Sequence, residues 1–269
     1  MSEDLPPGLR NFRRAQRDVD GRRLTVFEAG EGPPVVVIHE IPAITDAVAE
    51  FCGHLVAQGF FVCAPQLFGT LGGGYGPARL AGAMARACIS REFAVFAAGA
   101  HSPIVDTLRA LCRQLSAERG DCKVGAIGMC LTGNFALTLA VDPVVAAPIL
   151  SQPSLPFGAT PRLRRALHAT PETIAEVRRR CDEEGLTVLG LRFSRDFLCP
   201  AARFDALREA LGDGFEPIVV PAGPDSDIGV SRFAHSVVTR DLVDERGHPT
   251  LAARARVVEF LRERLSPSA

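Results

Sequence analysis

Short apolar runs alternate with helix-forming segments along most of this 269-residue chain. The runs are rich in Val, Ile and Phe, which is typical of strands buried on both faces of a parallel sheet. Strands are predicted at 23–30, 33–40, 60–68, 122–129, 145–151, 186–194 and 215–223. Helices are predicted at 45–59, 104–120, 132–141, 170–185, 201–212 and 249–265. This alternation predicts an α/β fold in one domain over residues 1–269, with helices on both faces of a mostly parallel central sheet.

The overall composition excludes several classes of protein. Hydrophobic residues make up 47% of the chain, charged residues make up 23% and the net charge is −1, so no basic excess favours nucleic acid or an anionic membrane surface. The segment 1–14 lacks the apolar core of a signal peptide, and no apolar run reaches the roughly 18 residues of a membrane span. We therefore expect a cytoplasmic protein without nucleic-acid or membrane partners, either a monomer or a homodimer.

The eight cysteines are scattered and form no C-x-x-C pair, which predicts reduced and mostly buried thiols. A glycine-rich stretch at 69–77 is predicted to be a loop, and the region 69–101 is predicted to form part of a pocket wall. Arginine-rich stretches at 162–165 and 178–180 are expected on solvated helix faces.

Polar residues that follow the predicted strands indicate where a site would form. In sheets of this kind, functional side chains gather at the carboxyl ends of the strands. Cys130 follows the strand at 122–129, Asp196 follows the strand at 186–194, and His235 lies in a later loop. This order of nucleophile, acid and histidine is that of α/β hydrolases. The sequence thus predicts an α/β-hydrolase fold without a large cap domain, and a triad of Cys130, Asp196 and His235.

The stretch "GMCLTG" (128–133) is predicted to be a sharp turn between a strand and a helix. Such an elbow lifts Cys130 off the sheet and places its thiol at a helix N-terminus, where the helix dipole favours the thiolate. The backbone amide of Leu131 would then face a developing oxyanion. A second amide is expected from Ile41, in the loop after the strand at 33–40.

Four short motifs in this chain resemble those of the dienelactone hydrolase family. They are "HEI" (39–41), "GMCLTG" (128–133), "DFLCP" (196–200) and "HSV" (235–237). The resemblance implies a cofactor-free hydrolase of carboxylic esters or lactones, above all of a dienelactone, acting on a small-molecule substrate through an acyl-enzyme on Cys130. It also implies that Glu40 is a buried, thiol-activating residue that interacts with the resting thiol and moves away when substrate binds.

Two positions depart from the pattern of that family. The second small residue of the elbow, usually glycine, is Thr132. The substrate-binding arginine expected four residues after the histidine is absent, because that position is Thr239 and Arg240 follows it. The candidate contacts for a substrate anion are therefore Arg91, Arg195 and Arg240.

Each candidate residue also has a purely structural interpretation. Cys130 could be a small buried hydrophobic residue, and Asp196 could cap the helix that follows it. His248 is a rival for the role of His235. The pair at 39–40 lacks the second histidine of an H-E-x-x-H zinc motif, so no metal is expected.

Three other functions fit part of the pattern. Class I glutamine amidotransferases share the cysteine elbow, but their downstream H-x-E pair is absent here. A non-catalytic protein on a hydrolase scaffold would have a broken triad, and the triad residues are all present. An esterase or thioesterase with a different substrate would use the same residues, and the sequence does not choose between these substrates.

Overall fold

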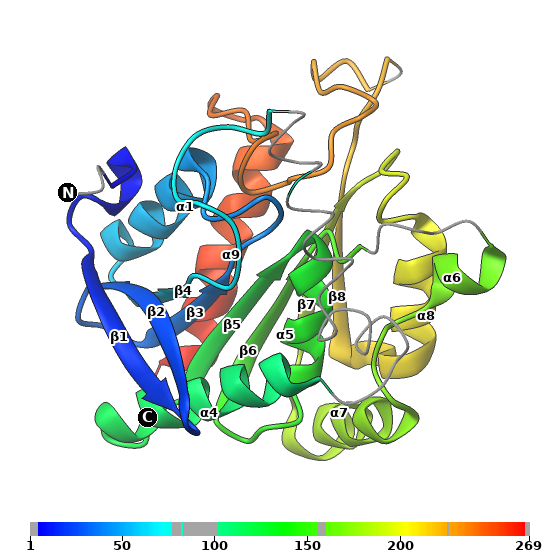
Figure 1. Cartoon of the computed structure of the whole chain (residues 1–269). Helices are drawn as coiled ribbons and strands as arrows, with labels where there is room; N and C mark the ends of the chain where they lie inside the picture. Colours follow the sequence, from blue (N-terminus) through cyan, green and yellow to red (C-terminus); the bar gives the residue numbers. More distant parts are fainter. Residues whose placement is uncertain (1–4, 77–81, 83–101, 155–159, 225, 267–269) are drawn as a thin grey trace.

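A computed structural model of the chain describes residues 5–76, 82, 102–154, 160–224 and 226–266. Its centre is one eight-stranded sheet with the order β1-β2-β4-β3-β5-β6-β7-β8 (Figure 1). The strands are β1 (Arg13–Val19), β2 (Arg22–Ala29), β3 (Pro34–Ile38), β4 (Phe61–Pro65), β5 (Val124–Met129), β6 (Val145–Ser151), β7 (Val188–Phe193) and β8 (Phe215–Val220). From β4 to β8 every neighbouring pair is parallel, whereas β1 and β2 join antiparallel, so the predicted mostly parallel sheet is confirmed.

Helices cover both faces of this sheet, as predicted (Figure 1). They are α1 (Asp46–Ala57), α4 (Pro103–Glu118), α5 (Gly133–Leu139), α6 (Pro161–Arg165), α7 (Pro171–Glu184), α8 (Ala201–Leu211) and α9 (Pro249–Leu265). Short 3-10 turns are η1 (Pro7–Leu9), η2 (Cys130–Thr132) and η3 (Gly212–Gly214). Among the described residues, no helix combines the length and the apolar character needed to cross a bilayer.

The alternation of side chains along the strands explains why both faces are covered. In β3, Val35 and Val37 pack in one core cluster with α1 and α9. Val36 and Ile38 point the other way and pack in a second cluster with α4 and α5. A strand with apolar residues at both parities must bury both faces, which requires a helix layer on each side.

Strand β1 was not predicted. Its sequence "RRAQRDV" is polar and mostly exposed, because β1 is the edge of the sheet. Val19 pairs with Arg22 across a two-residue turn in which Asp20 and Gly21 have φ of 50° and 74°. Asp-Gly is the preferred dipeptide for such a hairpin turn, so this pair was the local signal that could have revealed the strand.

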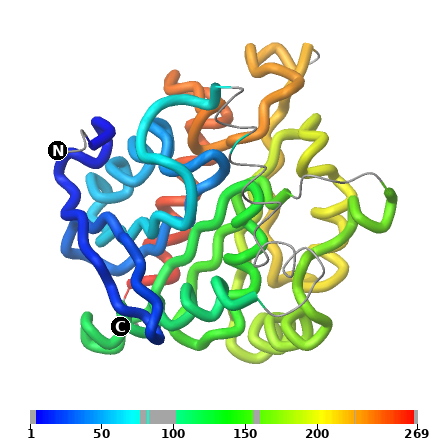
Figure 2. The backbone as a smooth tube through the Cα atoms, in the orientation of Figure 1, coloured from blue at the N-terminus to red at the C-terminus, as the bar shows by residue number. Residues whose placement is uncertain are grey.

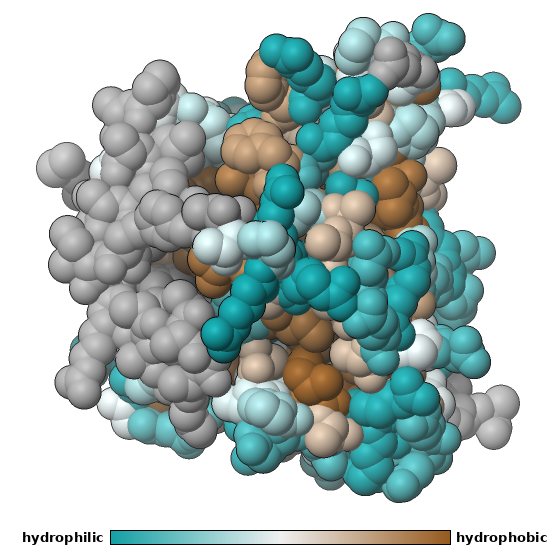
Figure 3. All heavy atoms as spheres, turned by 90° about the vertical axis from the view of Figure 1, so that its right-hand side faces the viewer, coloured by the Kyte–Doolittle hydropathy of each residue, from teal (hydrophilic) through white to brown (hydrophobic). Residues whose placement is uncertain are grey.

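The arginine-rich stretch of α7 is only partly solvated. Figure 3 shows many hydrophilic residues on this side of the molecule, and Arg178 of α7 pairs with Asp182 at 2.7 Å. Arg180, however, is buried, and its Nη1 donates to the carbonyl oxygens of Ala140 and Val145 at 2.6 and 3.1 Å. The prediction of a solvated face was therefore wrong for Arg180, because its guanidinium satisfies carbonyls left open where α5 ends.

The parallel topology gathers six loops at one edge of the sheet. The carboxyl ends of β3, β4, β5, β6, β7 and β8 point the same way, toward the top of the view in Figure 2. Segments that are far apart in the sequence therefore meet above the sheet.

Candidate active site

Cys130 occupies a strained elbow between β5 and α5. Its φ is 55°, a left-handed conformation that is rare for a non-glycine residue and costs about 1–3 kcal/mol. The turn is so tight that a Cβ on Gly128 would lie 2.1 Å from the carbonyl oxygen of Thr132, so this position must be glycine. The thiol is thereby held above the carboxyl edge of the sheet, as a nucleophile on an elbow requires.

Thr132 fits the elbow although the related pattern has glycine there. Its backbone is helical with φ −78°, and its Oγ1 accepts a hydrogen bond from the amide of Met129 at 3.0 Å. The same Oγ1 lies 2.9 Å from the carbonyl oxygen of Ile38, at the end of β3. The threonine hydroxyl therefore ties the elbow to the loop that carries Glu40 and Ile41.

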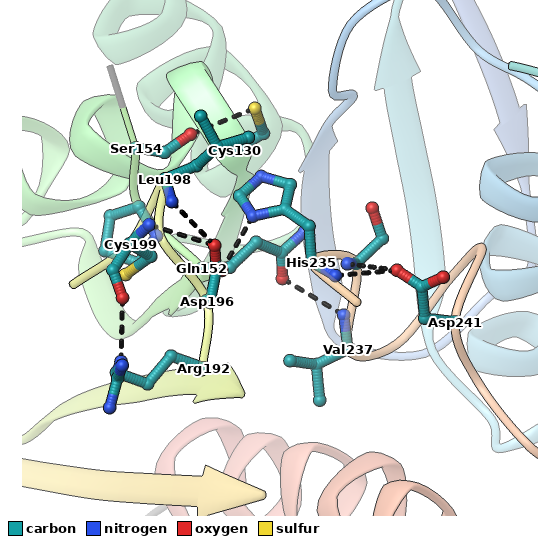
Figure 4. A network of polar contacts seen from close by, with 12 residues as sticks. Cys130, Gln152, Ser154, Arg192, Asp196, Leu198, Cys199, His235, Val237 and Asp241 are labelled. Atoms are coloured by element: carbon teal, nitrogen blue, oxygen red, sulfur yellow. Dashed lines mark hydrogen bonds and ion pairs between the residues drawn. The ribbon is translucent and has the colours of Figure 1, made fainter. Parts of the chain in front are cut away.

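His235 and Asp196 meet across two loops in the arrangement of a catalytic dyad (Figure 4). Nδ1 of His235 lies 2.7 Å from Oδ2 of Asp196, and both side chains are buried. Oδ1 of Asp196 accepts hydrogen bonds from the amides of Leu198 and Cys199 at 2.9 and 3.1 Å. Asp196 is not the cap of α8, whose N-cap is Pro200, and its other oxygen, Oδ2, lies against the imidazole of His235.

The other imidazole nitrogen of His235 is placed for proton transfer. Because Nδ1–H donates to a carboxylate, Nε2 faces the side of Cys130, and Figure 4 shows the ring between Asp196 and Cys130. Within the described part of the chain, the buried Nε2 has no hydrogen-bond partner. Burial alone would lower the pKa of His235, but the negative charge of a Cys130 thiolate and the bond to Asp196 outweigh it and raise the pKa to about 10. The site therefore favours the protonated form of His235.

The loop that carries His235 is fastened by Asp241, which sequence reasoning missed. Oδ2 of Asp241 accepts hydrogen bonds from the amides of His235 and Ser236 at 2.7 and 2.9 Å. Arg240 pairs with the same carboxylate at 2.8 Å, and its guanidinium lies 5.2 Å from the ring centroid of Tyr75. Arg240 thus takes part in internal contacts of this loop, and a role for it in binding substrate stays a prediction.

Glu40 is nearly fully buried, at 1% exposure, and accepts four hydrogen bonds. The hydroxyls of Tyr75 and Thr239 donate to Oε1 at 2.6 and 2.5 Å. The hydroxyl of Ser236 and the side-chain amide of Gln152 donate to Oε2 at 2.8 and 3.3 Å. The carboxylate therefore joins the 69–76 loop, the end of β6 and the His235 loop.

The hydrogen bonds of Glu40 come from residues other than Cys130, and its role as a thiol-activating residue stays a prediction. Oγ of Ser154 lies 3.1 Å from Sγ of Cys130, whereas the four hydrogen bonds that Glu40 accepts come from other residues. Two hydroxyls in the His235 loop, those of Ser236 and Thr239, donate to the Glu40 carboxylate. No sequence motif indicated Ser154, although it lies only three positions after the end of β6.

Removal of the Glu40 carboxylate should mainly affect stability. We expect Glu40→Ala to lower the free energy of unfolding by about 3–5 kcal/mol, because each buried donor left without an acceptor costs roughly 1–3 kcal/mol. Glu40→Gln should cost less, because the neighbouring hydroxyls can turn and accept. Urea denaturation curves measure both, with exposed Glu50→Ala as the matched control. A loss for Glu40→Ala no larger than that of the control would contradict this assignment.

Gln152 is a further member of the site that lacked a sequence signal. It is fully buried with φ 35°, and its Oε1 accepts the amide of Val237 at 3.3 Å while its Nε2 donates to Glu40. The strained residue thus links the end of β6 to the His235 loop.

The amides of Leu131 and Ile41 are compatible with the predicted oxyanion hole. Leu131 lies directly after the thiol on η2, and Thr132 draws the Ile41 loop toward the same elbow. Among the backbone hydrogen bonds of the loops and turns in the described residues, neither amide is a donor. Their role stays a prediction.

Four further candidate residues remain, and the structure describes three of them. His248 is the N-cap of α9, with Nδ1 2.7 Å from the Thr250 hydroxyl, which removes it as a rival of His235. Arg195 is exposed, and its side chain packs near Gly223, while Arg91 falls outside the described residues. His39 is buried, and burial lowers its pKa to about 4, so it is neutral. In the described part of the chain, no group of three metal-ligating side chains occurs.

Comparison with known proteins places this geometry in a wider context. The family model "Dienelactone hydrolase family" matches residues 23–214, a span that includes Cys130 and Asp196 and ends before His235. No curated protein sequence matches the chain.

Several solved structures share the fold. A putative dienelactone hydrolase from Klebsiella pneumoniae is 14% identical, with 96% of this chain and 99% of that chain covered and a TM-score of 0.57. A dienelactone hydrolase from Anabaena variabilis is 14% identical, with 94% and 98% covered and a TM-score of 0.59. An esterase from Pyrococcus furiosus is 12% identical, with 95% and 93% covered and a TM-score of 0.58. At these identities the likeness concerns the fold alone.

Proposed function

The chain belongs to the dienelactone hydrolase family, and from this premise we propose that it is a cysteine hydrolase of carboxylic esters or lactones. One observation carries the proposal: a cysteine on a strained elbow, with φ 55°, lies beside a histidine that is paired with a buried aspartate at 2.7 Å. A merely structural cysteine needs neither the strain nor the dyad.

The proposed reaction has two halves. In the first, the Cys130 thiolate adds to the carbonyl carbon, and the amides of Leu131 and Ile41 stabilise the oxyanion. The carbon–oxygen bond to the leaving group then breaks, and the leaving oxygen takes the proton from Nε2 of His235. In the second half, neutral His235 takes a proton from water, whose oxygen adds to the thioester carbonyl. The carbon–sulfur bond breaks, which frees the acid and restores the thiolate and the imidazolium.

The surroundings of the dyad favour a substrate with an apolar part. Phe197 directly follows Asp196 and is 63% exposed, and Phe233 precedes His235 by two positions and is 61% exposed. Exposed aromatic side chains on the loops that carry a site can offer apolar contact area to a ligand. Among esters, lactones and thioesters, we propose a dienelactone as the first substrate to test, on the strength of the family.

Acyl-enzyme trapping tests the proposal directly. Wild-type protein is mixed with a dienelactone, with p-nitrophenyl acetate and with an acyl thioester, then quenched in acid and digested for peptide mass spectrometry. We expect the acyl group on the peptide that contains Cys130. An acyl group on Ser154 instead would overturn the cysteine nucleophile, and no turnover of any of the three substrates would overturn the hydrolase assignment.

The raised pKa of His235 predicts an unusual pH profile. His235 stays protonated well above the ordinary value of 6.5, so it can protonate a poor leaving group up to alkaline pH, and kcat/KM for an alkyl ester should fall only as pH approaches about 10. Stability should also decrease with rising pH, because the folded state binds the His235 proton more tightly than the unfolded state does. The free energy of unfolding therefore falls as pH rises from 6.5 toward 10.

A p-nitrophenyl ester is the matched control for this profile. Its leaving group departs without a proton, so its alkaline limb should be absent or much weaker. An alkaline limb near the ordinary histidine pKa for the alkyl ester would contradict the prediction.

A further inference from the structure

We propose that the hydroxyl of Ser154 is the group that orients the thiol of Cys130 and stabilises its thiolate in this chain. The inference rests on the proposed function and deepens it, because the related pattern gives the contact with the thiol to Glu40. Its starting point is the 3.1 Å separation between Oγ of Ser154 and Sγ of Cys130 (Figure 4).

The structure builds Ser154 into this position through the backbone. The amide of Ser154 donates to the carbonyl oxygen of Cys130 at 3.0 Å, so the two residues are held together by a main-chain bond as well. Gly133 permits the approach, because a Cβ there would lie 2.8 Å from Cα of Pro153. Asn134 also holds Ser154, because its Nδ2 donates a hydrogen bond to the carbonyl oxygen of Ser154 at 3.3 Å.

A buried cation supports the same segment. Arg203 of α8 is 1% exposed and donates through Nη1 to the carbonyl oxygen of Pro153 at 2.9 Å and through Nη2 to that of Leu163 at 3.1 Å. Burial lowers the pKa of Arg203, and the negative charges of Asp196 and a Cys130 thiolate act against that shift. Arg203 therefore anchors the residue before Ser154 and also places a positive charge near the thiolate.

Glu40, the partner of the thiol in the related pattern, already accepts hydrogen bonds from four other groups. Both carboxylate oxygens of Glu40 are held by donors from Tyr75, Gln152, Ser236 and Thr239. A neutral hydroxyl has a further advantage over a carboxylate beside the thiol. It donates to the thiolate without repelling it, whereas a second negative charge would disfavour ionisation.

The test measures the thiol without any substrate. Full-length wild type, Ser154→Ala and Ser154→Thr are alkylated with iodoacetamide across a pH range, and the rate at Cys130 is followed by peptide mass spectrometry. Ser116→Ala is the matched control, because Ser116 is also buried and its hydroxyl donates at 2.7 Å to the carbonyl oxygen of Cys122. The seven described cysteines are free, so peptide resolution is needed to isolate the signal of Cys130.

We expect the pH midpoint of alkylation to move up by roughly one unit in Ser154→Ala, since a hydrogen bond to a charged group is lost. Ser154→Thr and Ser116→Ala should keep the wild-type midpoint. A Ser154→Ala midpoint that is unchanged or lower would overturn the proposal. If Ser154→Ala does not fold, Ser154→Val compared with Ser154→Thr gives the same contrast between methyl and hydroxyl.

This readout separates the inference from the proposed function. If the wild type hydrolysed none of the esters, lactones or thioesters, the proposed function would fail while the alkylation midpoints still decided the role of Ser154. Conversely, if the acyl-enzyme forms normally but the pH midpoint of Cys130 alkylation is the same in Ser154→Ala and wild type, the proposed role of Ser154 is refuted and the hydrolase proposal stands.

Discussion

Cys130→Ala is expected to lower kcat by roughly 10⁴- to 10⁶-fold on every substrate that the wild type hydrolyses, the range seen when a covalent nucleophile is removed. The reason is that alanine has no atom to form the acyl-enzyme, while the oxyanion amides and the dyad remain. The backbone strain at φ 55° also remains, so the variant should fold as the wild type does. Steady-state kinetics on the best substrate measures the effect.

A second cysteine supplies the control for this variant. Cys181 lies half-buried on α7 and is also a free thiol, so Cys181→Ala removes the same sulfur atom away from the site. We expect Cys181→Ala to keep the wild-type kcat. If Cys130→Ala hydrolysed substrate as fast as Cys181→Ala does, then Cys130 would not be the nucleophile.

Asp196→Asn is expected to lower kcat by about 10⁴-fold, in line with the loss of an orienting carboxylate in other triads. The structure shows why the effect should be large although the shape is kept. The amides of Leu198 and Cys199 donate to Oδ1, so the asparagine oxygen will stay on that side. Its NH₂ group then faces Nδ1 of His235, which forces the proton to Nε2 and leaves the neutral imidazole in the wrong tautomer.

The same geometry predicts a distinctive pattern for Asp196→Asn. Because the two amide contacts persist, the free energy of unfolding should change little compared with the loss of activity. Exposed Asp182→Asn on α7 serves as the control for the chemical change. A kcat within tenfold of wild type for Asp196→Asn would argue against Asp196 as the residue that orients His235.

Several helices could be predicted from local sequence patterns. Helix α9 has the predicted bounds 249–265, and Thr170 caps α7 through its hydroxyl, which lies 3.2 Å from the amide of Thr173. Such features depend on residues within one or two turns of each other. Strand β1 lacked a signal of this strength, because an edge strand carries little apolar pattern.

The sequence indicated some residues of the candidate site and gave no signal for others. The strand-end rule indicated Cys130, Asp196 and His235, since parallel strands bring their carboxyl ends to one edge whatever the details of packing. The structure brings Asp196 and His235 together at 2.7 Å, and their catalytic role stays a prediction. Ser154 and Asp241 had no signal, because each acts through a contact that depends on how its loop is folded.

By itself, the amino-acid sequence determined the α/β class, the family and the order of the triad residues, because hydrophobic periodicity and short motifs are local properties of the chain. The partners of the two central side chains were decided by tertiary structure alone. Glu40 accepts a hydrogen bond from Thr239, which is 199 positions away, and the Cys130 thiol lies 3.1 Å from the hydroxyl of Ser154. A buried carboxylate goes where the most donors converge, and that convergence exists only once the loops have packed.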